Sequence, residues 1–179
     1  MPLRPKFAFL SAACACLGAV SAPAAAPEVP SFELDIMPIL TARGCNAGAC
    51  HGKQRGQNGF QLSLLGFDPD FDYFALTREG RGRRVFPGDP ERSLLLRKGS
   101  AQMPHGGGVR IKAGERDYLT LRRWIAGGMP RRNPGEPKVV RIDVAPTTRS
   151  VKPRQAYPLK VLAHYSDGSR RDVTPWTTF

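Results

Sequence analysis

The chain has 179 residues, which is enough for one ordinary domain or two small ones. Its formal net charge is +12, and its 19 glycines and 17 prolines indicate many turns and loops. The basic residues are spread along the chain without an aromatic-basic platform, which argues against a nucleic-acid-binding function. We expect instead a solvated basic surface that can dock acidic partners.

The first 24 residues have the pattern of an export signal. Arg4 and Lys6 form a basic start, residues 7–20 are an apolar run, and A-P-A supplies a cleavage site. The run is shorter than the about 20 residues that span a bilayer. We therefore predict a signal peptide over residues 1–24, a mature chain without a transmembrane span, and localisation in the periplasm or at the cell surface. A lipoprotein anchored at Cys14 is the alternative.

The first structural element predicted after the signal is a helix. Ser31 can cap it, and apolar residues recur at helical spacing as far as Leu40. Pro38 predicts a kink or a later start, and Gly44 ends the pattern. Residues 52–92 are rich in glycine, aspartate and arginine, so we expect loops and short turns there that wrap something apolar.

Two further helices and a glycine-rich loop are predicted before the chain changes character. Residues 89–96 suggest a short capped helix, and residues 100–112 a loop. Residues 115–126 give the clearest helix, with apolar residues on one face and a Gly-Gly end.

Alternating apolar residues then predict β-strands around residues 140–144 and 159–165. The S-D-G-S string at 166–169 predicts a hairpin turn. Residues 139–179 are about half of the roughly 100 residues of a β-sandwich. We therefore expect an N-terminal fragment of a longer protein with downstream domains.

The main chemical motif is C-N-A-G-A-C-H-G, in which Cys45 and Cys50 are followed directly by His51. Two free thiols rarely persist in an oxidising compartment. Cys-x-x-Cys-His is the signature of c-type haem attachment, in which both thiols bind the haem and the histidine coordinates its iron. Here four residues separate the thiols. The spacer residues are small, so a bulge is possible without contact with the macrocycle.

Other interpretations of the same residues stay open. Cys45 and Cys50 can form a disulfide, which leaves His51 unexplained. A zinc site from Cys45, Cys50, His51 and His105 requires adjacent Cys50 and His51 to reach one tetrahedral ion. The predicted cofactor is one covalent haem c per chain, with His51 as the proximal ligand.

The second axial ligand is expected from the loop at 102–108. Met103 offers a thioether and His105 an imidazole. Because these residues are two positions apart in an extended loop, both side chains can point the same way. We favour His105; Met103 and an open iron site are the alternatives. Tyr73, Phe74 and Trp124 are candidate pocket walls from their character.

Several motifs in order resemble the planctomycete-type cytochrome c domain: CNAGACHG at 45–52, GFQLSL at 59–64, FDPDFDY at 67–73, PHGGG at 104–108 and LRRWI at 121–125. The resemblance implies a wide-spaced Cys-x4-Cys-His form and an imidazole from Pro-His-Gly-Gly-Gly. Residues 139–179 resemble a bacterial immunoglobulin-like domain of the group 2 type.

These observations together predict a mainly α, small cytochrome c-like haem domain over residues 30–132 and a linker over 133–138. An incomplete all-β immunoglobulin-like sandwich is predicted over 139–179. The expected function is electron transfer through haem to an unidentified, possibly acidic redox partner. The alternatives are a haem domain with an open iron site for peroxide or gas chemistry, and an exported adhesion module without haem.

Overall fold

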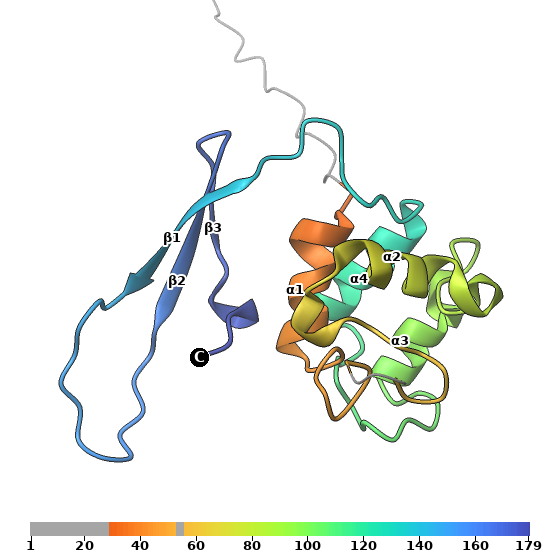
Figure 1. Ribbon diagram of the computed structural model, residues 1–179, viewed down its shortest axis with the longest axis horizontal. Helices are drawn as coiled ribbons and strands as arrows, with labels where there is room; N and C mark the ends of the chain where they lie inside the picture. Colours follow the sequence, from red (N-terminus) through yellow and green to blue (C-terminus); the bar gives the residue numbers. More distant parts are fainter. Residues whose placement is uncertain (1–28, 53–55) are drawn as a thin grey trace, which may run out of the picture.

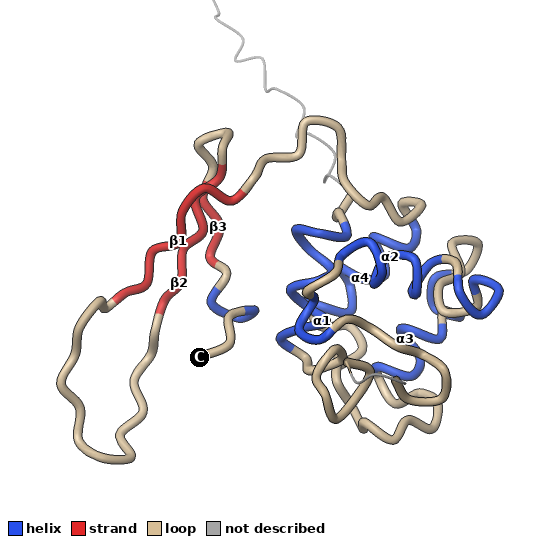
Figure 2. Tube along the Cα trace, viewed as in Figure 1, coloured by secondary structure: helices blue, strands red, loops and turns tan. Residues whose placement is uncertain are grey.

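The computed structural model describes residues 29–52 and 56–179, so the predicted signal peptide lies outside the described part of the chain. Figure 1 shows a group of short helices beside a small sheet, and Figure 2 shows how much of the chain is loop. The helices and strands are α1 (Met37–Ala42), α2 (Pro69–Thr77), α3 (Leu94–Gly99), α4 (Arg116–Ala126), β1 (Val139–Ala145), β2 (Lys160–Tyr165) and β3 (Arg170–Asp172).

The predicted fold class is wrong. The described residues form a mixed small domain with four α-helices and a three-stranded antiparallel sheet, not a mainly α domain, and a cytochrome c-like haem fold is not shown. The helices are short, and α4 is the longest with 11 residues. Glycines in left-handed conformations, such as Gly44 after α1 at φ 70°, stop them early.

The predicted sandwich also needs correction. The strands form one sheet in the order β1-β2-β3. Val161, Ala163 and Tyr165 of β2 are buried, and β1 is exposed along its whole length. The apolar face of the sheet lies against the segment around Trp176, which itself packs on the helical core. The helical part therefore covers a face that a second sheet covers in a sandwich.

Several local predictions are confirmed. The Ser31 side chain caps the first helical segment by accepting the backbone N–H of Leu34 at 3.3 Å. That segment is a π-helical turn that passes into α1, and Pro38 lies in the first turn of α1. The hairpin between β2 and β3 closes at the predicted turn, where Gly168 donates to the carbonyl of Tyr165 at 3.0 Å.

Helix α2 lies where loops and turns were predicted. Asp68 caps it by accepting the N–H of Phe71 at 3.0 Å, and Pro69 occupies the first helical position. Both are standard signals of a helix start. The exposed Phe74 obscured the apolar face, because the residues that α2 buries deeply are the small Ala75, Leu76 and the polar Asp72.

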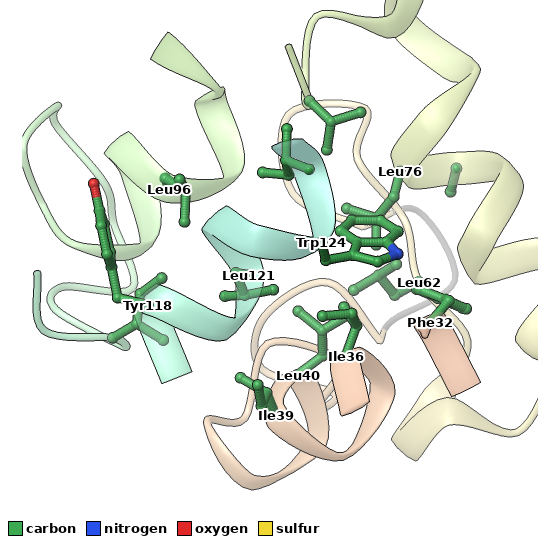
Figure 3. Packing of buried hydrophobic residues seen from close by; sticks show 14 residues of the cluster. Phe32, Ile36, Ile39, Leu40, Leu62, Leu76, Leu96, Tyr118, Leu121 and Trp124 are labelled. Atoms are coloured by element: carbon green, nitrogen blue, oxygen red, sulfur yellow. The ribbon is translucent and has the colours of Figure 1, made fainter. Parts of the chain in front are cut away.

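The core of the helical part is organised around α4, as Figure 3 shows. Trp124 is fully buried, and its indole N–H donates to the carbonyl of Pro130 at 3.0 Å. Its ring centroid lies 5.7 Å from that of Phe32. The apolar interior is thus filled by side chains of the chain itself: Phe32, Ile36, Ile39, Leu40, Leu62, Leu76, Leu96, Leu121, Trp124 and Ile125.

A groove of about 330 Å³ runs between the sheet and the first helical segment, with Ile142, Ala163 and Trp176 among its lining residues.

Within the described residues, the helices are too short and too polar for any of them to cross a bilayer.

The exposure of the chain after residue 130 predicts where a protease cuts first. Arg131 and Arg132 are held by Glu33, with Nη2–oxygen distances of 2.8 and 2.6 Å, whereas residues 146–156 between β1 and β2 are exposed at every position. Within residues 131–179, trypsin should therefore cut first at Arg149 or Arg154, as identified by mass spectrometry of early fragments, because Pro153 blocks cleavage after Lys152. Glu33→Gln should raise cleavage at residues 131 and 132. First cleavage of the unaltered protein at 131 or 132 would contradict this assignment.

Candidate functional site

The Cys45–His51 segment forms a compact closed loop directly after α1. The N–H of Cys45 donates to the carbonyl of Leu40 at 2.8 Å, which joins the loop to the helix. The N–H of His51 donates back to the carbonyl of Cys45 at 3.0 Å. The four-residue spacer is therefore folded into turns, and His51 stays beside the first cysteine despite the wide spacing.

Gly52 is required by the close approach of two backbone segments. A Cβ atom at this position would lie 1.9 Å from the carbonyl oxygen of Asn46, which real structures do not tolerate. The Asn46 side chain is buried, and its Nδ2 donates to Thr41 Oγ1 at 2.9 Å. Gly52 therefore makes room for the loop itself.

The His51 ring is oriented by Phe60, at the end of the next loop. Its Nδ1 lies 2.9 Å from the backbone carbonyl oxygen of Phe60. A carbonyl can only accept, so Nδ1 carries the hydrogen and the lone pair of the neutral ring lies on Nε2. The Phe60 ring also contacts the imidazole, with centroids 4.5 Å apart. Metal-binding histidines usually donate the hydrogen of their other ring nitrogen to a carbonyl or carboxylate in this way, which fixes the tautomer and the ring orientation.

His105 has the same arrangement on the glycine-rich loop. Its Nδ1 lies 3.0 Å from the carbonyl oxygen of Gly108, so its neutral ring also has the lone pair on Nε2. Gly107 permits this fold, because a Cβ there would lie 2.9 Å from Cε1 of the same imidazole. The loop thus positions His105 through its own backbone.

The two imidazoles lie together although they are far apart in the sequence. The ring centroids of His51 and His105 are 6.3 Å apart, with an interplanar angle of 11°. The two rings are therefore nearly parallel in a stacked arrangement, which brings two candidate nitrogen ligands close together.

Met103 is half-buried, and its backbone N–H donates to the carbonyl of Arg97 at 3.1 Å. His105, the other candidate second ligand, has its ring against that of His51. The predicted pocket walls lie elsewhere. Trp124 is in the core, Tyr73 donates its hydroxyl to the carbonyl of Met129 at 2.8 Å, and Phe74 is exposed.

Cys45 and Cys50 are both free thiols, each half-buried. Cys45 packs against the hydrophobic core, and this burial raises the pKa of its thiol to about 11, against a weaker opposing effect of the Arg110 charge. Cys45 is therefore a protonated thiol at neutral pH, and the protonated form is a poor nucleophile for disulfide exchange.

Arg110 is the neighbour that sequence analysis missed. Its Nη2 lies 3.5 Å from Cys50 Sγ, and its Nε is buried without a hydrogen-bond partner among the described residues. Nothing in the sequence identifies it among the many arginines, because its partner is 60 residues away. The role of the Phe60 carbonyl was likewise hidden, since only the apolar ring of Phe60 was visible as a signal.

The described residues bring together no group of three or more histidine, cysteine, aspartate or glutamate side chains that could hold a metal ion. The zinc alternative needed four such ligands. The residues present fit haem in another way: two unpaired thiols, and two imidazoles with their Nδ1 atoms held by carbonyls.

Comparison with known proteins adds no assignment, since no family model, curated protein or solved structure matches the chain.

The raised pKa of Cys45 predicts slow alkylation. In a Cys50→Ser chain without cofactor, iodoacetamide at about pH 8 should modify folded Cys45 about 100-fold more slowly than the unfolded chain, because each pKa unit is a factor of ten in thiolate. The rate should keep rising with pH until about 11, which is the pKa that burial gives this thiol. A plateau near pH 9 would show that Cys45 is not desolvated.

Proposed function

We propose that this chain binds one haem covalently through Cys45 and Cys50, coordinates its iron with His51 and His105, and transfers electrons outside the cytoplasm. The observation that carries the proposal is the nearly parallel pair of imidazoles 6.3 Å apart, beside two unpaired thiols. The proposal rests on this site and on the ordered sequence motifs around it, and it does not depend on the predicted fold class.

The thiols supply the attachment. Each thiol adds across one vinyl double bond: an S–C bond forms, the S–H bond breaks, and the hydrogen passes to the other vinyl carbon. The addition consumes no oxidant. The neutral state of Cys45 suits this chemistry, because the thioether product is also neutral and remains against the hydrophobic core.

His51 and His105 would each hold the iron through a ring nitrogen. When bound, the haem provides one-electron redox chemistry. His51 is fixed by the Phe60 carbonyl and by closure of the cysteine loop, and His105 by the Gly108 carbonyl. Because backbone groups hold both rings, little reorganisation accompanies ligation, which favours rapid electron transfer.

The proposed function also includes export of the chain from the cytoplasm and docking to a redox partner. Covalent haem attachment of this type fits the predicted signal peptide and the periplasm or cell surface. The net charge of +12 falls to +10 when Arg4 and Lys6 are removed with the predicted signal peptide, and this positive excess favours a redox partner with an acidic surface.

The covalent bond is tested by extraction. Protein produced with periplasmic cytochrome maturation should keep its haem absorbance after denaturation in acid acetone, because thioethers survive this treatment. The Cys45→Ala, Cys50→Ala double variant should lose all of it, while His51→Ala should change iron ligation and leave the thioethers chemically possible. Complete loss of haem from the unaltered protein would disprove covalent attachment.

The second axial ligand is tested by two single substitutions. His105→Ala should change the absorption spectrum and raise the midpoint potential if a weaker ligand replaces the imidazole, because imidazole stabilises ferric iron more than thioether does. Met103→Ala should leave both unchanged. Loss of a sulfur-to-iron charge-transfer band in Met103→Ala alone would instead identify Met103. No effect of either change would indicate an open site and favour peroxide or gas chemistry.

A further inference from the structure

Arg110 places a cation beside the thiols that are proposed to hold the haem. Its backbone N–H donates to the carbonyl of Gly99 at 2.8 Å, and the next residue, Ile111, is buried in the core. The guanidinium lies next to Cys50 Sγ, at 3.5 Å from Nη2. Its Nε would lie 3.4 Å from a Cβ at Gly107, on the loop that carries His105. The charge is thus located between the two parts of the proposed site.

Other arginines of this protein have their guanidinium groups paired with a carboxylate. Arg43 uses its Nε and Nη2 on the carboxylate of Asp117, at 2.7 and 2.5 Å. Arg131 and Arg132 use the same two atoms on Glu33. In each case a carboxylate lies on the Nε–Nη2 edge and cancels the positive charge.

Arg110 differs from all three. Its Nη2 lies 3.5 Å from the Cys50 sulfur, which is a weak acceptor, and its buried Nε has no acceptor among the described residues. No carboxylate in the described residues forms an ion pair with it. Its charge is therefore neither cancelled by an acid nor fully screened by water, and it acts over a longer range than a surface charge.

We infer that Arg110 sets the reduction potential of the haem, by holding an uncancelled positive charge next to the Cys50 tether. The inference rests on the proposed function. Reduction removes one positive charge from the iron, so a nearby cation favours the ferrous state and raises the potential.

The test uses the full holoprotein and three variants. Arg110→Gln keeps the size and polarity of the side chain but removes the charge, and Arg110→Lys keeps the charge. Arg92→Gln is the matched control, because Arg92 is an exposed arginine whose side chain is 76% accessible. The midpoint potential of each is measured by spectroscopic titration at low and at high salt.

Arg110→Gln should lower the ratio of reduced to oxidised haem at fixed potential about tenfold, which for one electron corresponds to a shift of about 59 mV. This shift should persist at high salt, since salt screens partly buried charges weakly. Arg110→Lys should stay near the unaltered protein, and Arg92→Gln should have little effect that salt removes. An unchanged potential in Arg110→Gln with haem still attached would overturn the inference alone.

Failure of the unaltered protein to bind haem covalently would overturn the proposed function together with this inference, and the extraction assay distinguishes that outcome.

Discussion

The arrangement of the site depends on one buried carboxylate at the start of α4. Asp117 accepts the Nε and Nη2 of Arg43, at the end of α1, and the indole N–H of Trp176 at 3.2 Å. It therefore joins the core helix, the segment that leads into the Cys45 loop, and the chain that follows the sheet. Arg43 is 39% exposed, so loss of Asp117 costs less than the about 3–5 kcal/mol of a fully buried pair, but it removes a polar contact from all three elements at once.

Local sequence patterns predicted the elements that local interactions determine. The Ser31 cap, helix α4 and the hairpin after Tyr165 each depend on residues within a few positions of one another. The predicted fold class was wrong because the number of predicted helices indicates neither how long the helices are nor which other segments pack against them. The burial of the sheet face near Trp176 depends on contacts between residues more than 50 positions apart, such as its hydrogen bond to Asp117.

The same division applies to the site. Cys45, Cys50, His51 and His105 could be selected from motif chemistry, and the structure brings the two histidine rings to 6.3 Å. The groups that orient these residues could not be selected, because they are backbone carbonyls or a distant side chain. Backbone carbonyls are present at every position, so no residue type marks the one that meets His51. A motif therefore identifies ligands better than it identifies what fixes their geometry.

The basic residues of this protein fall into two electrostatic classes. Surface arginines such as Arg92 act through water and salt, where the Debye length is about 10 Å at 0.1 M, so they favour the approach of an acidic partner and have little influence on a buried iron. Arg110 is partly shielded from water and lacks an acidic partner among the described residues. In the proposed holoprotein, two imidazoles lower the potential and this cation raises it. The reduction potential then depends on the opposing effects of the two imidazoles and of Arg110. A substitution that changes either effect shifts the potential without altering the thioether bonds.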